Sequence, residues 1–139
     1  KGLSLTVEKQ MIKRKGDTVY TLGIDSGSTS TNAIILDENR QIKAFSVVRT
    51  GAKSSQSADA ALADVLKKAG LDREDISLIV STGYGRVSIP FADKNVTEIS
   101  CHGKGAHLLF PDVHTILDIA DRTAKRSVSM KRGMSSILS

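Results

Sequence analysis

The fold of this chain is decided by residues 20–37, which read YTLGIDSGSTSTNAIILD. Two runs rich in β-branched and aliphatic residues, 19–25 and 31–37, flank a short link of serine, glycine and threonine. Such runs on either side of a turn-forming link predict a strand, a turn and a second strand. We therefore expect a β-hairpin at the start of the folded domain, with its turn at 26–30.

An acidic residue, Asp25, ends the first predicted strand directly before this small, hydroxyl-rich turn. Small residues let backbone N–H groups approach a phosphate, hydroxyls donate to its oxygens, and a carboxylate can hold Mg²⁺ or its waters. The pattern predicts a phosphate-binding turn. The alternative is an ordinary hairpin in which Asp25 caps its own turn.

The residues after this hairpin alternate between strand and helix patterns. An apolar run at 42–49 predicts a third strand, and the tight turns between the three strands make them an antiparallel meander. Apolar residues recur at helical spacing over 58–69. We expect Ser55 or Ser57 to cap the start of this helix and Gly70 to end it.

A nearly continuous apolar run at 76–82 predicts a fourth strand, of the kind that is central and covered on both faces. Residues 83–86 follow its C-terminal end, where α/β proteins place ligand loops. Tyr84 and Arg86 in this loop either clamp a ligand or belong to a plain glycine-flanked surface turn.

A second helix is predicted at 97–110, ended by Pro111, and a fifth strand at 113–120. The order β-β-β-α-β-α-β describes an α/β domain of the RNase-H-like type. If the strands that carry Asp25 and Asp118 end side by side, the two carboxylates face one cleft, as metal-assisted phosphoryl transfer requires. Two unrelated surface acids are the alternative.

Length and composition restrict the class of protein. With 139 residues the chain is one domain or a piece of one, and its start at Lys1 favours a fragment or a processed start. The single cysteine, Cys101, excludes an internal disulfide and is typical of a reducing compartment. No apolar run reaches membrane-spanning length, and residues 1–18 are unlike a signal peptide. We expect a cytoplasmic protein without a membrane segment.

The net charge of +5 is concentrated in the two terminal segments. Residues 1–16 and residues 121–139 each hold five basic residues and one acidic residue, which gives +4 for each segment. Residues 17–120 hold ten basic and thirteen acidic residues, which gives −3. Because the central part is mildly acidic, we expect no nucleic-acid-binding face on it.

Four ordered blocks resemble one known family: YTLGIDSGSTS (20–30), TGYGR (82–86), TEISCHGKGA (97–106) and TILDI (115–119). They are similar to blocks of the BadF/BadG/BcrA/BcrD ATPases, which include the activators of 2-hydroxyacyl-CoA dehydratases and benzoyl-CoA reductases. The resemblance covers about residues 19–119.

This resemblance implies one half of an actin-like ATPase fold, shared by actin, Hsp70 chaperones and sugar kinases, in which two RNase-H-like halves enclose a nucleotide cleft. It implies ATP and Mg²⁺ as cofactors. Family members are homodimers with a four-iron–four-sulfur cluster shared between subunits. They couple ATP hydrolysis to the transfer of one low-potential electron to a partner dehydratase or reductase.

The resemblance also assigns site residues. The first phosphate loop would comprise Asp25, Ser26, Gly27, Ser28, Thr29 and Ser30. Asp25 would lie near Mg²⁺. Asp118 would open the second phosphate loop, where it would help to hold the metal or position the attacking water as a catalytic residue.

The sequence departs from the family after Ile119. The family continues with Gly-Gly-Gln-Asp-Ser-Lys, whereas residues 120–125 read ADRTAK, which places a methyl group and a negative charge beside the expected phosphate. Codons for the family sequence, read one base out of frame, can spell the residues found at 120–127. We therefore expect residues 120–139 to be an aberrant, frameshifted basic tail that is poorly ordered or only incidentally folded.

The predicted organisation is a linker at 1–17, an ATPase subdomain at 18–119 and the tail at 120–139. The leading hypothesis is the N-terminal part of an activase that lacks the cysteines of the iron–sulfur cluster and is inactive as this fragment. A sugar or acyl-group kinase of the same superfamily, or a non-catalytic interaction module, are the alternatives. Whether this chain forms the family's homodimer is left open.

Overall fold

The structure is a computed structural model that describes residues 18–120, 123–131 and 134–136, with side-chain burial described for 18–116. The chain divides into two units, residues 1–95 and residues 96–139, which are described in turn. The predicted linker at 1–17 lies outside the described residues.

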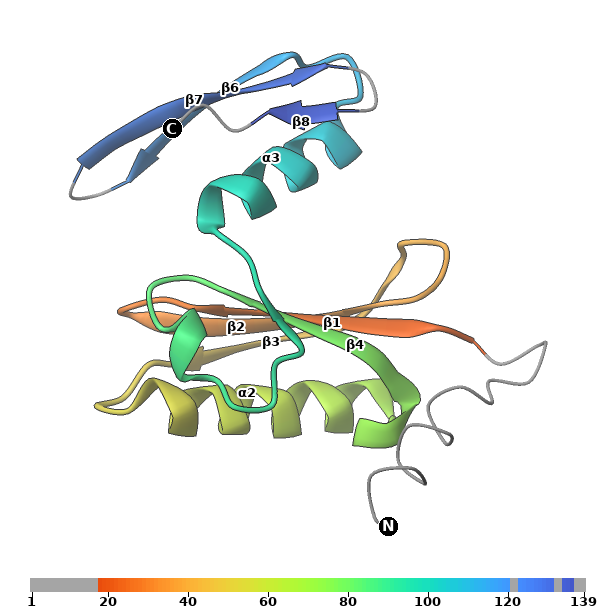
Figure 1. The fold of residues 1–139 in the computed structure, drawn as a ribbon. Helices are drawn as coiled ribbons and strands as arrows, with labels where there is room; N and C mark the ends of the chain where they lie inside the picture. The colour runs from red at the N-terminus through yellow and green to blue at the C-terminus, as the bar shows by residue number, and fades with distance from the viewer. Residues whose placement is uncertain (1–17, 121–122, 132–133, 137–139) are drawn as a thin grey trace, which may run out of the picture. The chain divides into compact units, whose positions relative to one another are not determined.

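The first unit is built on a five-stranded mixed sheet with the strand order β3-β2-β1-β4-β5 (Figure 1). Its strands are β1 (Tyr20–Ser26), β2 (Ser30–Leu36), β3 (Ile42–Arg49), β4 (Ile76–Thr82) and β5 (Lys94–Asn95). The first three pair antiparallel, whereas β4 runs parallel to both β1 and β5. The predicted meander followed by a crossover to a fourth strand is therefore confirmed.

Helix α2 (Ser54–Ala69) joins β3 to β4 and packs along one face of the sheet (Figure 1). Side chains alternate along the hairpin, so that every second residue of β1 and β2 is buried. The core consists of strand residues Leu22, Ile24, Ala33, Ile35, Ile76 and Ile79, helix residues Ala58, Ala61 and Val65, and Ile89. Burying each large aliphatic side chain stabilises the fold by about 1.5–3 kcal/mol.

The sequence predicted the C-terminal end of α2 correctly and its N-terminal cap incorrectly. Gly70 ends the helix as expected, with a φ of 67° and an N–H that bonds to the carbonyls of the last turn. The predicted serine cap is wrong, because Lys53 is the N-cap residue and makes no side-chain cap. Ser57 lies inside the first turn, where its hydroxyl accepts from Gly51 N–H at 2.9 Å.

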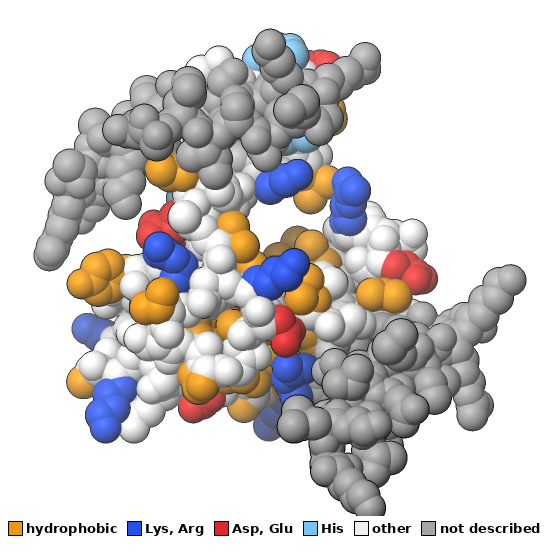
Figure 2. All heavy atoms as spheres, viewed as in Figure 1, with side chains coloured by type: hydrophobic (Ala, Val, Ile, Leu, Met, Phe, Trp, Pro, Cys, Tyr) orange, Lys and Arg blue, Asp and Glu red, His pale blue; other side chains and the backbone are white. Residues whose placement is uncertain are grey.

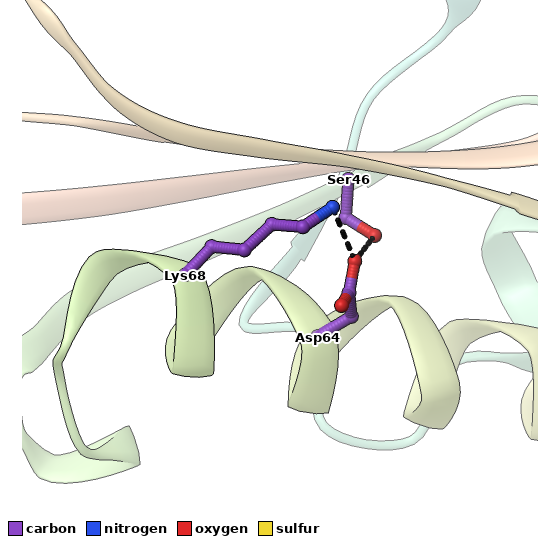
Figure 3. Close-up of polar contacts among 3 residues, drawn as sticks. All are labelled: Ser46, Asp64 and Lys68. Carbon is purple, nitrogen blue, oxygen red and sulfur yellow. Dashed lines mark hydrogen bonds and ion pairs between the residues drawn. The ribbon is translucent and has the colours of Figure 1, made fainter.

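A polar contact ties α2 to β3 (Figure 3). The Ser46 hydroxyl donates to Oδ2 of Asp64 at 2.5 Å, and Nζ of Lys68 lies 2.8 Å from the same oxygen. Hydrogen bonds from Lys68 and then from Ser46 hold the pKa of the Asp64 carboxyl below its usual value. The contact therefore favours the ionised form of Asp64.

Strand β4 is flanked by two short 3-10 helices that the sequence did not predict, η1 (Arg73–Asp75) and η2 (Arg86–Ser88). Its Ile79 and Ser81 side chains are buried, whereas Leu78 and Val80 are half-buried and Ser77 is exposed. The expectation of a strand fully covered on both faces is therefore met on one face only.

The second unit contains helix α3 (Glu98–Leu109) and an antiparallel sheet with the strand order β6-β7-β8. Its strands are β6 (Thr115–Ala120), β7 (Thr123–Lys131) and β8 (Met134–Ser136). The Thr97 hydroxyl caps α3 by accepting from Ser100 N–H at 3.4 Å. The predicted second helix and fifth strand are thus found within two residues of their expected bounds.

The predicted tail at 120–139 has regular backbone structure where it is described. Strand β7 pairs with β6, and β8 pairs with β7. Because residues 120–139 lack apolar periodicity, the expectation was a tail that is poorly ordered or only incidentally folded, and its described part is folded into strands. The frameshift origin of these residues stays a prediction.

Charged side chains of both signs are interspersed over the described part of the face in Figure 2. The edge strand β3 exposes Ile42, Phe45 and Val47. Within the described ranges, neither α2 nor α3 has the length and apolar character that a membrane-spanning helix needs.

Candidate phosphate-binding site

The predicted phosphate turn is a tight connection between the end of β1 at Ser26 and the start of β2 at Ser30. Gly27 donates its N–H to the Ser30 carbonyl at 3.0 Å. A Cβ atom on Gly27 would lie 2.9 Å from that carbonyl oxygen, so the turn needs glycine at this position. Ser28 and Thr29 are exposed at the tip.

Thr50, just beyond β3, holds this turn from behind. Its hydroxyl donates to the Gly27 carbonyl at 2.9 Å, and its N–H donates to the Thr29 carbonyl at 2.9 Å. The same hydroxyl lies 2.9 Å from that of Thr31. Sequence reasoning missed Thr50. No local sequence signal marks it, because residue 50 is placed beside the turn by the pairing of Ser30 with Arg49 at the end of β3.

The buried residues of β1, Leu22, Ile24 and Ser26, face α2, and side chains alternate along a strand. Asp25 therefore lies on the opposite face of the sheet. The strand register places Asn32 of β2 and Thr82 of β4 directly beside Asp25. These three polar residues therefore form one row across the sheet. The Thr82 hydroxyl is buried and makes no hydrogen bond with any described residue, which is costly unless a ligand or its water supplies one.

The loop after β4 lies directly against the end of β1. Gly83 has a φ of 90°, and a Cβ atom on it would lie 2.5 Å from Oδ1 of Asp25 and 2.6 Å from the Ser26 carbonyl oxygen. Gly85 donates its N–H to that carbonyl at 3.0 Å. A Cβ atom on Gly85 would collide with Oγ of Ser26 and lie 2.8 Å from Oγ of Ser54. Only glycine permits this approach at both positions.

The two candidate clamp residues of this loop have different surroundings. The Arg86 guanidinium donates to the Gly83 carbonyl at 2.9 Å, so Arg86 closes its own turn. Tyr84 is 88% exposed at the tip of the loop. For Arg86 the structure favours the surface-turn alternative, and its hydrogen bond fixes the backbone that contacts Asp25.

Asp118 lies in β6, at a register shift between Leu117 and Ile119 in the pairing with β7. The strand neighbours of β1 are β2 and β4, and β6 pairs with β7 in the second unit. The expectation that Asp25 and Asp118 end neighbouring strands of one sheet is therefore not met among the described strands, because β6 pairs with the residues that follow it. A shared site for the two carboxylates stays a prediction.

Among the described residues, no group of three or more histidine, cysteine, aspartate or glutamate side chains is placed to hold a metal ion. Mg²⁺ bound with a nucleotide needs only one or two carboxylates, because phosphate oxygens and waters complete its shell. The Asp25 carboxylate, beside the buried Thr82 hydroxyl, fits that requirement.

The sequence profile of the BadF/BadG/BcrA/BcrD ATPase family matches residues 22–133. The chain belongs to the BadF/BadG/BcrA/BcrD ATPase family. Its predicted family is therefore confirmed, and the match continues beyond the predicted domain end at residue 119.

Two curated relatives are enzyme activators. The activator of lactoyl-CoA dehydratase from Anaerotignum propionicum is 48% identical over 107 residues, which are 77% of this chain and 41% of the relative. The (R)-2-hydroxyglutaryl-CoA dehydratase activating ATPase from Acidaminococcus fermentans is 42% identical over 109 residues, which are 78% of this chain and 42% of the relative. The chain thus spans about two fifths of the length of the curated relatives it matches.

Solved structures agree on the fold. Component A of the Acidaminococcus fermentans (R)-2-hydroxyglutaryl-CoA dehydratase has a TM-score of 0.75 at 38% identity, over 86% of this chain and 46% of that one. The activator of 2-hydroxyisocaproyl-CoA dehydratase from Clostridium difficile, solved with bound ADPNP, has a TM-score of 0.71 at 36% identity, over 82% of this chain and 42% of that one. The ROK hexokinase of Thermus thermophilus shares the fold alone, with a TM-score of 0.55 at 12% identity over 70% of this chain and 40% of the hexokinase. The predicted actin- and sugar-kinase-type α/β fold is confirmed.

Proposed function

We propose that this chain is the N-terminal part of an ATP-dependent activase, and that residues 25–30 are its first phosphate loop. The observation that carries the proposal is the contact of Gly83 with the Asp25 carboxylate beside the tight Gly27 turn. Two similar proteins support it. One is the activating ATPase of Acidaminococcus fermentans, and the other is an activator that was solved with bound ADPNP.

The loop offers donors to phosphate oxygens. The carbonyls of Gly27, Thr29 and Ser30 are engaged in hydrogen bonds, whereas no described residue accepts from the N–H groups of Ser28 and Thr29. Both residues are exposed and carry hydroxyls. Consecutive N–H groups and hydroxyls at one turn form a concave anion site.

Asp25 is the residue proposed to hold Mg²⁺, directly or through water, with the Thr82 hydroxyl next to it in the row across the sheet. When bound, the ion neutralises charge on the phosphate oxygens. Gly83 and Arg86 keep the loop that contacts the Asp25 carboxylate in place.

The second phosphate loop is proposed to begin at Asp118, which holds the metal or positions the attacking water. In this chain Ala120 and Asp121 replace the glycine pair of the family motif. Because phosphoryl transfer depends on positioning and electrostatic stabilisation, a chain with one altered loop is expected to lack turnover. In the full-length protein, we propose that hydrolysis drives an electron to an acyl-CoA dehydratase or reductase.

A titration of the isotope-labelled chain with ATP, followed by nuclear magnetic resonance, tests the nucleotide site. We expect the amide signals of Ser28 and Thr29 to shift when Mg²⁺ is present, with a dissociation constant of about 1 mM. Asp25→Asn should remove the dependence on Mg²⁺, whereas Asp59→Asn, on the exposed face of α2, should not. Absence of a shift at the loop, or an unchanged response in Asp25→Asn, would contradict the proposal.

A further inference from the structure

We infer that Thr50, a residue outside the phosphate loop, is the positioning residue that gives the loop its phosphate-binding shape. The inference rests on the proposed function, because it concerns the same loop. In this role Thr50 does not contact the nucleotide. It acts through the backbone of Gly27 and Thr29.

Three hydrogen bonds join Thr50 to the hairpin. Its hydroxyl donates to the Gly27 carbonyl at 2.9 Å, its N–H donates to the Thr29 carbonyl at 2.9 Å, and its oxygen lies 2.9 Å from Oγ1 of Thr31. Thr31 is fully buried. A hydroxyl has one donor and two acceptor positions, so the Thr31 hydroxyl donates to Thr50 while Thr50 donates to Gly27.

These bonds set the direction of the loop dipoles. A carbonyl that points at Thr50 cannot also point at a phosphate, where its partial negative charge would repel the ligand. Because the C=O of one residue and the N–H of the next point in opposite directions in a planar peptide, the Gly27 carbonyl held by Thr50 turns the Ser28 N–H away from Thr50. No described residue accepts from the Ser28 N–H, which is therefore available to an anion. The side of the loop that faces away from Thr50 therefore presents donors.

Thr50 is itself fixed to the core of the first unit. The next residue, Gly51, donates its N–H to the Ser57 hydroxyl at 2.9 Å. Ser57 belongs to the first turn of α2 and is buried beside Ala58, which is part of the core. The hydrogen-bond path from the loop thus ends on a rigid element, as a positioning residue requires.

Two substitutions of Thr50 distinguish a role in positioning the loop from a general effect on the stability of the chain. Thr50→Val keeps the shape of the side chain but removes the hydroxyl, and Thr50→Ser keeps the hydroxyl. Thr21→Val, at the other end of β1, is the control for loss of a threonine hydroxyl elsewhere in the sheet. Amide hydrogen exchange at Gly27 in the ligand-free chain and the affinity for magnesium tripolyphosphate are measured for each variant.

We expect Thr50→Val to speed exchange of the Gly27 N–H about tenfold and to weaken tripolyphosphate binding about tenfold, as loss of one hydrogen bond permits. Thr50→Ser and Thr21→Val should stay within about twofold of the parent chain in both measurements. If Thr50→Val is too unstable to fold, Thr50→Ala serves in its place.

Two results would overturn the inference: exchange and affinity unchanged in Thr50→Val, or losses in Thr50→Ser as large as those in Thr50→Val. If the parent chain binds neither tripolyphosphate nor ATP, the proposed function fails. The positioning role of Thr50 is then decided by the ligand-free exchange at Gly27, which needs no phosphate.

Discussion

Gly83 packs against Asp25 so closely that a Cβ atom on Gly83 would lie 2.5 Å from the carboxylate oxygen Oδ1. Gly83 also has a φ of 90°, a backbone conformation that residues with a side chain rarely adopt. Position 83 is thus restricted to glycine for two independent reasons. One is the positive φ, and the other is the close approach of the Asp25 carboxylate, which is proposed to bind the metal.

Substitution of Gly83 tests this relationship. Gly83→Ala is expected to lower the free energy of unfolding by about 1–3 kcal/mol and to abolish the Mg²⁺-dependent part of ATP binding, because the methyl group displaces the Asp25 carboxylate. Gly70→Ala is the matched control, since Gly70 has a φ of 67° and no atom of the described residues lies within 4 Å of its Cβ position. Urea unfolding and ATP titration should show a loss of stability for both variants and a loss of binding for Gly83→Ala alone. Equal ATP binding in the two variants would contradict the role of Gly83.

Gly105 is expected to be a site where alanine stabilises the chain. It lies within α3, and a Cβ atom there would meet no atom of the described residues within 4 Å. Gly105→Ala should raise the stability of the helix by about 1 kcal/mol, because alanine loses less backbone entropy than glycine when the helix forms. Thermal unfolding followed by circular dichroism checks the result. A lower transition temperature would show that Gly105 has a packing role that its surroundings do not reveal.

The Asp64 carboxyl is expected to make stability depend on pH. Its pKa is lower in the folded chain than its usual value of 3.8, mainly through the hydrogen bond from Lys68. The stabilising contribution is therefore present above pH 4 or so and is lost as the pH falls through the folded pKa. Lys68→Met should raise the pKa of Asp64, whereas Lys67→Met should raise it less, because Lys67 contributes the smallest of the stabilising interactions. Carboxyl titration by nuclear magnetic resonance tests this order, and a larger effect of Lys67→Met would contradict it.

The purified chain is expected to show no ATP hydrolysis above background. The chain spans about two fifths of the length of its curated relatives, and the proposed first loop alone would leave the base and much of the phosphate in water. Ala120 and Asp121 also stand where the family resemblance implies a glycine pair. Phosphate release with Mg²⁺·ATP is the measurement, and Asp25→Ala should not change it. Turnover that Asp25→Ala abolishes would show that the site is complete within this chain.

Much of the first unit could be predicted from sequence because local patterns determine it. The third and fourth strands were found at their predicted bounds, Ile42–Arg49 and Ile76–Thr82. Two runs of β-branched and aliphatic residues around a link of small residues identified the hairpin, and Gly70 marked the end of α2. The turn at 26–30 was recognisable because its small and hydroxyl-bearing residues follow one another in the sequence.

The rest of the site depends on contacts between distant residues. The placement of Thr50 behind the turn follows from the register of β3 on β2, and that of Gly83 against Asp25 follows from the parallel pairing of β4 with β1. Neither of these strand pairings can be predicted from a local sequence pattern. The cap of α2 was mispredicted because the Ser57 hydroxyl bonds to Gly51 N–H instead of serving as the N-cap. The second sheet was missed because residues 120–139 lack the alternation that marks a half-buried strand.

Adding Mn²⁺·ATP to the isotope-labelled chain tests whether residues 25–30 bind the phosphates of a metal–nucleotide complex. Paramagnetic broadening of amide signals falls off steeply with distance from the ion, so it reports where the metal binds. We expect broadening to be strongest at Asp25–Ser30 and at the adjoining Thr82–Gly85 loop, and we expect Asp25→Asn to remove it. Broadening centred elsewhere, such as on the acidic η1 turn at Arg73–Asp75, with the signals of Ser28 and Thr29 unaffected, would contradict it.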